Sequence, residues 1–96
     1  MISDEIYHGI EYEKKTYSLN LFGDDVIVIN SFSKYFCMPG WRLGWVTIPT
    51  SLKDNFLKLS QNLFISSNNI AQYAAIKSFE NVNYFNKNVE IYLKNR

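Results

Sequence analysis

The sequence predicts an α/β fold in which a mostly parallel sheet with one antiparallel strand is followed by helices. Three observations indicate it. Residues 26–29 form an unbroken β-branched run, and residues 42–48 form a second strand-like segment close behind it. Three apolar patterns with helical spacing then follow from residue 51 to the C-terminus. The chain has 96 residues, so these elements belong to a single domain at most.

The two strand-like segments differ in how they end and pair. Residues 26–29 read Val-Ile-Val-Ile without polar alternation, which predicts a strand covered on both faces. Residues 42–48 end at Pro49, and the connection between the two segments is too short for a helical crossover. Neighbouring strands joined this way should pair antiparallel. Residues 1–2 resemble the tail of a further strand, whose remainder we expect to be missing.

Three amphipathic helices are predicted in the second half of the chain. Ser51 and Asp54 have the spacing of a capping box, and the polar break at residues 66–69 can cap a second helix. The apolar positions that recur at helical spacing are Leu52, Phe56, Leu59 and Leu63, then Ile70, Tyr73, Ala74 and Phe79, then Val82, Phe85, Val89, Tyr92 and Leu93. No stop signal follows the third set, which we interpret as a chain interrupted within a helix.

Composition excludes several classes of function. Hydrophobic residues make up 47% and charged residues 20% of the chain, as in a globular protein. The net charge of +1, with scattered lysines, argues against nucleic acid as a partner. No apolar run is long enough for a membrane helix and residues 1–4 do not form a signal peptide, so we expect a cytoplasmic protein. Cys37 is the single cysteine, which excludes an internal disulfide and predicts a small buried side chain.

Polar residues gather where the predicted strands end. Asp4 follows the first strand-like segment, Lys34 lies in the loop after residues 26–29, and Arg42 opens the antiparallel segment. Ligands of open α/β sheets bind beyond the carboxyl ends of the parallel strands. Asp4 and the loop with Lys34 can therefore converge on one pocket, and Arg42 joins them if its strand begins at that edge.

Two motifs in these loops are similar to a known enzyme family. Residues 31–34, Ser-Phe-Ser-Lys, and residues 38–45, Met-Pro-Gly-Trp-Arg-Leu-Gly-Trp, resemble the pyridoxal-phosphate (PLP) attachment signature of class I/II aminotransferases. Residues 4–7, Asp-Glu-Ile-Tyr, resemble the motif upstream of it in the same family. The resemblance runs over essentially the whole chain. It implies that residues 1–96 are a fragment of the PLP-binding large domain of a fold-type I enzyme, whose members are commonly homodimers.

The resemblance implies a catalytic role for one residue. Lys34 would form the Schiff base with the cofactor aldehyde, and would then act as the base beside the substrate Cα. Such a lysine must be neutral often enough to react, which burial and a neighbouring cation favour, and Arg42 is available as that cation. Asp4 would pair with the protonated pyridine nitrogen and keep the ring a good electron sink.

The remaining implied contacts bind the cofactor. Tyr7 would donate a hydrogen bond to the ring oxygen of PLP. Ser31 and Ser33 would offer hydroxyls to the phosphate, and Arg42 would present a planar fork to two phosphate oxygens. The sequence contains no metal-ligand cluster, so no metal is expected.

The same residues also have purely structural interpretations. A lone lysine after a strand is usually solvated, an aspartate at a strand end usually caps a turn, and loop serines usually satisfy the backbone. Phe32, Trp41 and Trp45 are predicted as core aromatics, and His8 as a surface or packing residue.

Three hypotheses for function remain open. The first is an aminotransferase acting on amino-acid and 2-oxo-acid substrates, of which this fragment alone would be inactive. The second keeps PLP but changes the reaction to β-elimination or carbon–sulfur cleavage, because any chemistry that begins with Cα deprotonation can use the same residues. The third is a non-catalytic remnant or interaction polypeptide. Turnover by the intact parent separates the first two.

Overall fold

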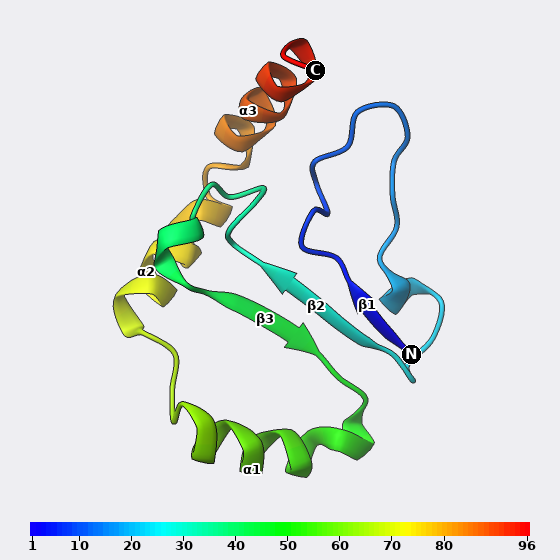
Figure 1. Ribbon diagram of the computed structural model, residues 1–96, viewed down its shortest axis with the longest axis vertical. Helices are drawn as coiled ribbons and strands as arrows, with labels where there is room; N and C mark the ends of the chain where they lie inside the picture. Colours follow the sequence, from blue (N-terminus) through cyan, green and yellow to red (C-terminus); the bar gives the residue numbers. More distant parts are fainter.

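A three-stranded sheet forms the centre of the computed structural model, which describes residues 1–96 (Figure 1). Strand β1 spans Ile2–Asp4, β2 spans Ile27–Ser31 and β3 spans Gly44–Thr47. The order is β1-β2-β3, with β1 parallel to β2 and β3 antiparallel to β2. The antiparallel pairing predicted for the second and third strands is confirmed. The short connection between them makes that direction the natural one.

The observed strands differ from the predicted ones at their ends and in their burial. Strand β2 begins one residue later and continues through Ser31, while Arg42 lies outside β3. Within β2, Val28 is buried but Ile29 is 40% exposed, so the prediction of cover on both faces was wrong. Successive side chains in a strand point to opposite faces, and in this chain only one face of β2 is packed.

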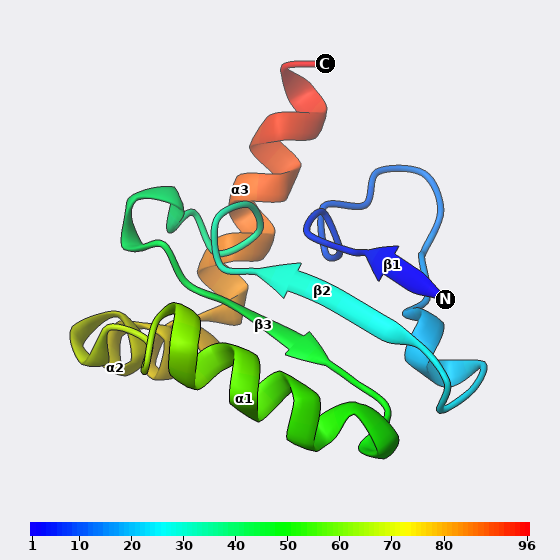
Figure 2. The same cartoon turned by 60° about the horizontal axis from the view of Figure 1, so that its bottom comes forward.

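Three helices follow the sheet, as predicted. Helix α1 spans Lys53–Leu63, α2 spans Asn69–Phe79 and α3 spans Val82–Lys94. A 3-10 turn at Thr50–Leu52 leads into α1, which starts without a side-chain cap, so the predicted capping box does not form. Asn68 does cap α2, because its side chain accepts a hydrogen bond from the Ala71 amide at 3.2 Å. Figure 2 shows α1 and α2 on the side of the sheet next to β3.

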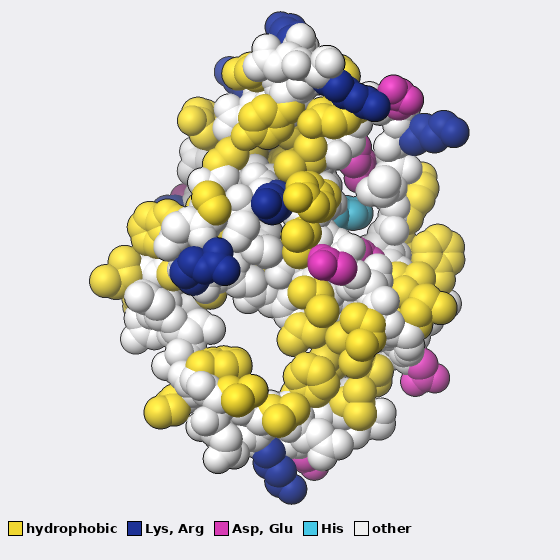
Figure 3. Space-filling view, in the orientation of Figure 1, with side chains coloured by type: hydrophobic (Ala, Val, Ile, Leu, Met, Phe, Trp, Pro, Cys, Tyr) yellow, Lys and Arg dark blue, Asp and Glu magenta, His cyan; other side chains and the backbone are white.

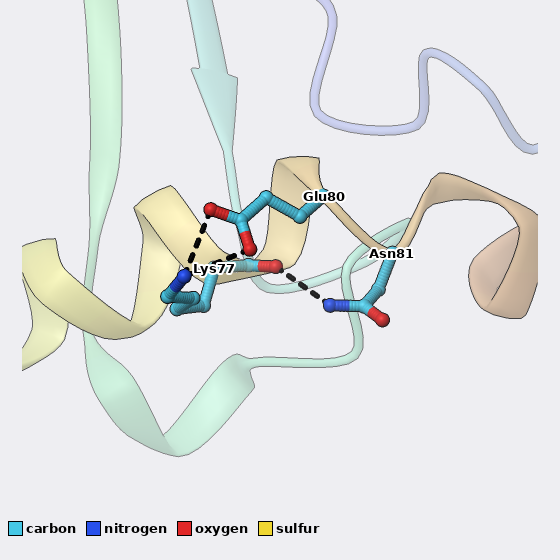
Figure 4. A network of polar contacts seen from close by, with 3 residues as sticks. All are labelled: Lys77, Glu80 and Asn81. Atoms are coloured by element: carbon cyan, nitrogen blue, oxygen red, sulfur yellow. Dashed lines mark hydrogen bonds and ion pairs between the residues drawn. The ribbon is translucent and has the colours of Figure 1, made fainter.

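A small polar network marks the junction between α2 and α3 (Figure 4). The Lys77 ammonium lies 2.9 Å from both carboxylate oxygens of Glu80, and the Asn81 amide donates to the Lys77 carbonyl at 2.9 Å. A cation and an amide donor in this position complement the free carbonyls at the end of a helix. The network therefore fixes the tight turn between the two helices, although its exposed ion pair contributes little stability by itself.

The core lies between the loop after β2 and the last two helices. Its buried members are Phe32, Phe36, Met38, Ala75 and Phe85. Phe36 is central to it, because its ring lies 5.0 Å from Phe32, 5.1 Å from Phe79 and 5.4 Å from Phe85, measured between centroids. Tilted and edge-on aromatic pairs of this kind add to the stabilisation that burial provides. The loop that carries Lys34 is thus held by packing and not by the sheet alone.

The apolar faces of the helices are only partly covered. Helix α2 buries its small residues Ala71, Ala75 and Ser78, and leaves Ile70 and Tyr73 exposed, contrary to the predicted face. Small side chains let the helix approach the core closely, which explains why this face of α2 is the buried one. Figure 3 shows further hydrophobic side chains along α1, beside a hollow between that helix and the sheet. None of the three helices combines the length and the hydrophobicity needed to cross a bilayer.

Candidate active site

The register of the sheet brings the three polar clusters to one edge. Asp4 lies opposite Ile29 near the carboxyl end of β2, and Ser31 lies opposite Gly44 at the amino end of β3. Parallel strands end at the same edge, and an antiparallel neighbour begins there. The expected convergence of the loops that carry Asp4, Lys34 and Arg42 is therefore observed at the level of the backbone.

Lys34 reaches the segment that follows β1. Its ammonium nitrogen lies 5.3 Å from the centroid of the Tyr7 ring, within the range of a cation–π contact. The backbone carbonyl of Lys34 accepts a hydrogen bond from the Cys37 amide at 3.0 Å, which closes a turn immediately after the lysine. Lys34 and Tyr7 are both exposed in this chain, so the burial expected around the lysine amine is not observed.

Asp4 holds the turn that begins where β1 ends. Its Oδ1 accepts a hydrogen bond from the Ile6 amide at 3.2 Å, while its side chain stays exposed. An aspartate that bonds the backbone two residues on forms an Asx turn, which fixes the direction of the carboxylate. The turn-capping interpretation and the cofactor role are therefore compatible, because one carboxylate oxygen remains available.

The two serines form a hydroxyl pair at the end of β2. Ser31 Oγ donates to Ser33 Oγ at 2.9 Å and accepts from the Ser33 amide at 3.0 Å, and it also lies 3.3 Å from the Leu43 carbonyl. The half-buried pair thus connects β2 to the residue that follows Arg42. Hydroxyls held together in this way can both turn toward an anion placed at the sheet edge.

Arg42 occupies an uncommon backbone conformation. Its φ of 51° lies in the left-handed region, and its Nη1 donates to the Pro39 carbonyl at 2.9 Å. Cys37, at the other end of the same short segment, also has a left-handed φ of 53°. A residue with a side chain in that region costs about 1–2 kcal/mol. Such strain is typical of functional loops that the surrounding structure holds in place.

The loop after β1 contacts the lysine-bearing loop at a second point, which the sequence did not reveal. Gly9 has a φ of 91°, and a Cβ atom at that position would lie 2.8 Å from the Tyr35 ring. The Tyr35 hydroxyl in turn donates to Asn86 on α3 at 2.6 Å. Gly9 stands two residues after Tyr7, and a glycine beside a candidate motif was the one available signal for this contact.

Cys37 does not have the buried environment predicted for it. The thiol is exposed and lies 3.3 Å from the Tyr92 hydroxyl, with the Asn88 amide at 3.6 Å. The left-handed backbone turns the residue outward, away from the core that its neighbours Phe36 and Met38 join. The contact with the Cys37 thiol, which also interacts electrostatically, raises the pKa of the Tyr92 hydroxyl above its usual value.

The aromatic predictions were right for one residue of three. Phe32 is buried at 6% exposure, whereas Trp41 and Trp45 are 46% and 40% exposed. The Trp45 ring still packs on Phe32 at 5.0 Å between centroids. His8 is exposed, with its Nδ1 3.5 Å from the Thr16 hydroxyl, in agreement with its prediction as a surface residue.

The chemistry of the donor set fits PLP. A carboxylate suits a protonated ring nitrogen, a primary amine suits an aldehyde, and hydroxyls beside a guanidinium suit a phosphate. Asp4, Lys34 and the Ser31–Ser33 pair supply these groups from one sheet edge, and Arg42 keeps guanidinium donors beyond the one bonded to Pro39. Asp4 and Tyr7 also line an open cavity of about 310 Å³, but its lining comes only from residues 3–17 and includes neither Lys34 nor the serine pair.

Comparisons with known proteins identify the family to which the chain is similar. The family model described as "Aminotransferase class I and II" matches residues 1–96. The (5-formylfuran-3-yl)methyl phosphate transaminase of Methanocaldococcus jannaschii is 51% identical over 83 residues, which cover 83% of this chain and 22% of the relative. The valine–pyruvate aminotransferase of Mycobacterium tuberculosis is 41% identical over 81 residues, covering 82% of this chain and 21% of the relative.

Solved structures show the same relationship in three dimensions. A crystal structure of an aminotransferase from Mycobacterium tuberculosis superposes with a TM-score of 0.94 at 38% identity, covering 99% of this chain and 27% of that chain. The chain thus spans about a quarter of the length of the proteins it matches. Its strands and helices correspond to part of the fold-type I architecture, and the chain belongs to the class I and II aminotransferase family.

Proposed function

We propose that residues 1–96 are the cofactor-anchoring part of the large domain of an aminotransferase, which moves an amino group between an amino acid and a 2-oxo acid with PLP. The observation that carries the proposal is the placement of the Lys34 amine over the Tyr7 ring, at the sheet edge where Asp4 and Ser31 also lie. When bound, PLP supplies an electron sink for the negative charge that develops at the substrate Cα.

The proposed roles follow from what each side chain can do at that edge. Lys34 would hold the cofactor through its amine and would serve as the base toward the substrate Cα. Asp4 keeps a proton on the pyridine nitrogen, and its Asx turn holds the carboxylate in one direction. The Tyr7 hydroxyl donates to the ring oxygen.

The phosphate is proposed to lie at the other end of the site. Ser31 and Ser33 offer their hydroxyls, and Arg42 offers the guanidinium N–H groups that do not bond Pro39. A planar guanidinium can grip two phosphate oxygens at once. The backbone hydrogen bond from the Phe32 amide to the Leu43 carbonyl, at 3.1 Å, keeps these two parts of the phosphate site at a fixed separation.

The exposed apolar surface supports the proposal that this chain works as part of a larger fold. Only 8 of 96 residues are buried, although 47% of the chain is hydrophobic. Leu63 and Ile65 are 74% and 83% exposed, and isolated soluble domains rarely leave so many large apolar side chains in water. We propose that further parts of the protein and a second subunit of a homodimer cover them, and that the protein works in the cytoplasm.

Trapping of the cofactor on its lysine tests the proposal. Borohydride reduction of the PLP-loaded full-length protein should fix the cofactor on Lys34, and Lys34→Ala should abolish the adduct. Lys53→Ala and Lys58→Ala, which change exposed lysines of α1, are matched controls and should leave it unchanged. An adduct that maps to Lys53 or Lys58 would contradict the assignment.

Turnover distinguishes the reaction types. Amino transfer that depends on an added 2-oxo acid would support the aminotransferase, whereas release of pyruvate and ammonia would indicate the lyase. Asp4→Ala should still permit the adduct while slowing Cα proton removal by several orders of magnitude, so near-normal turnover in that variant would remove Asp4 from its role.

A further inference from the structure

We propose that Glu5 is a positioning residue, whose carboxylate closes the loop between residues 5 and 19 and thereby sets Asp4 and Tyr7 against Lys34. The inference rests on the proposed function, since it concerns how that site is held together. Glu5 itself contacts neither the Lys34 amine nor the serine pair.

The contacts of Glu5 join two distant points of the chain. Its Oε1 accepts the Leu19 amide at 2.8 Å and the Ser3 hydroxyl at 3.1 Å, and its own amide donates to the Ile29 carbonyl at 2.8 Å. Leu19 is the first residue of a short 3-10 turn whose free amide needs an acceptor. The Glu5 carboxylate thus connects β1 to the far end of the loop, and the Glu5 backbone amide connects the same residue to the central strand β2.

The lowered pKa of Glu5 is what we expect of a carboxylate that accepts several hydrogen bonds. Burial opposes ionisation, but the Leu19 amide and the hydroxyls of Ser18 and Ser3 outweigh it, and the pKa of Glu5 lies below its ordinary value. The carboxylate is therefore ionised at neutral pH. Hydrogen bonds to an ionised acceptor are the stronger kind.

The geometry of β1 explains why this contact controls Asp4. Strand β1 is an edge strand of three residues, too short to hold its last side chain by itself. Side chains alternate between the faces of a strand, so Glu5 bonding to Ser3 on one face leaves Asp4 on the other. The bond from the Glu5 amide to Ile29 extends the pairing of β1 past Asp4, so anchoring Glu5 holds the end of the strand from which the Asp4 carboxylate projects.

The same contact controls Tyr7 through the loop. Tyr7 lies over the Lys34 amine and Gly9 lies against Tyr35, so the loop touches the lysine-bearing segment twice. Between Glu5 and Leu19 the loop contains no helix or strand. Ordering such a loop costs conformational entropy, and the bonds from Leu19 and Ser18 to the Glu5 carboxylate help to offset that cost by joining the two ends of the loop.

Four variants of the full-length protein test the proposal. Glu5→Ala removes the acceptor, and Glu5→Gln keeps a carbonyl oxygen for the Leu19 amide. Glu13→Ala is the matched control, because that carboxylate is in the same loop but is 79% exposed and reaches only Arg96 at 3.5 Å. Leu19→Pro breaks the same bond from the donor side, at a first-turn position that tolerates proline, and serves if Glu5→Ala does not fold.

Two measurements are made on each variant. Hydrogen exchange of the Leu19 amide reports the bond itself without any cofactor, and should accelerate in Glu5→Ala only. The PLP concentration that gives half-maximal borohydride-trapped adduct on Lys34 reports positioning. It should rise about tenfold or more in Glu5→Ala and Leu19→Pro, as expected for loss of a hydrogen bond to a charged group, and remain close to wild type in Glu5→Gln and Glu13→Ala.

The outcomes separate this inference from the proposed function. Faster exchange at Leu19 with unchanged trapping would make Glu5 merely structural and overturn the positioning role. Unchanged exchange in Glu5→Ala would overturn the contact itself. Failure of the wild type and Glu13→Ala to trap any adduct on Lys34 would overturn the proposed function, and the role of Glu5 toward the cofactor with it.

Discussion

The contact between Gly9 and Tyr35 makes a sharp prediction about stability. Gly9→Ala places a Cβ atom 2.8 Å from Cδ2 and 3.1 Å from Cγ of the Tyr35 ring, well inside ordinary van der Waals contact. The φ of 91° adds a backbone cost of about 1–2 kcal/mol for any residue with a side chain. Relieving the overlap by shifting packed atoms costs about 1–3 kcal/mol more. The expected loss is therefore about 2–5 kcal/mol.

Thermal unfolding and urea titration measure this loss. In the full-length protein, Gly9→Ala should lower both the melting temperature and the free energy of unfolding relative to wild type. Gly23→Ala is the matched control, because nothing lies within 4 Å of its Cβ and its φ is not positive. That variant should stay within about 1 kcal/mol of wild type.

A double-mutant cycle separates the two costs. In a Tyr35→Leu background the ring is gone, so Gly9→Ala should retain the backbone cost and lose the cost of the overlap. Equal stability of Gly9→Ala and Gly23→Ala would refute the reasoning as a whole. A cycle with no coupling between the two sites would refute the contact with the ring.

Three further predictions concern other contacts. Gly44→Ala should weaken the pairing of β2 and β3 by about 1–3 kcal/mol in urea unfolding, because its Cβ would lie 2.7 Å from the Asn30 carbonyl oxygen. Cys37→Ala should lower the pKa of Tyr92 toward its ordinary value in an ultraviolet titration, and an unchanged pKa would contradict the thiol contact. The pKa of Glu5 is lowered from 4.5, so its contribution to stability should be complete above pH 4.5 and lost as pH falls through the lower folded value. Glu5→Gln should flatten that part of the acid-unfolding curve.

Local patterns predicted the elements of the fold better than their burial. The polar break before α2 identified Asn68 as a cap, and the short connection before β3 identified the antiparallel pair. The burial of α2 was not predictable in the same way, because apolar residues such as Ile70, Ala71 and Tyr73 lie on several sides of that helix. Its tertiary neighbours, and not its periodicity, decide which side is buried.

In the candidate site, too, local patterns predicted some features and missed others. Motif spacing and strand direction predicted that Asp4, Lys34 and Arg42 gather at one edge, and the strand register agrees. The contact between Glu5 and Leu19 spans fourteen residues, and the contact between Gly9 and Tyr35 joins two loops. No pattern within a local window encodes such contacts, because they depend on how each loop closes.

Strand pairing sets the order of the polar clusters at the sheet edge. Two separate sets of contacts hold the loops that carry the side chains of the site. Aromatic packing of Phe32 and Phe36 holds the loop with Lys34, and the Glu5 carboxylate holds the loop with Tyr7. Damage to the aromatic core should therefore lower stability and disturb Lys34 together. Loss of the carboxylate should disturb the Tyr7 side of the site while the core stays intact, so the two kinds of variant are distinguishable by comparing melting temperature with cofactor affinity.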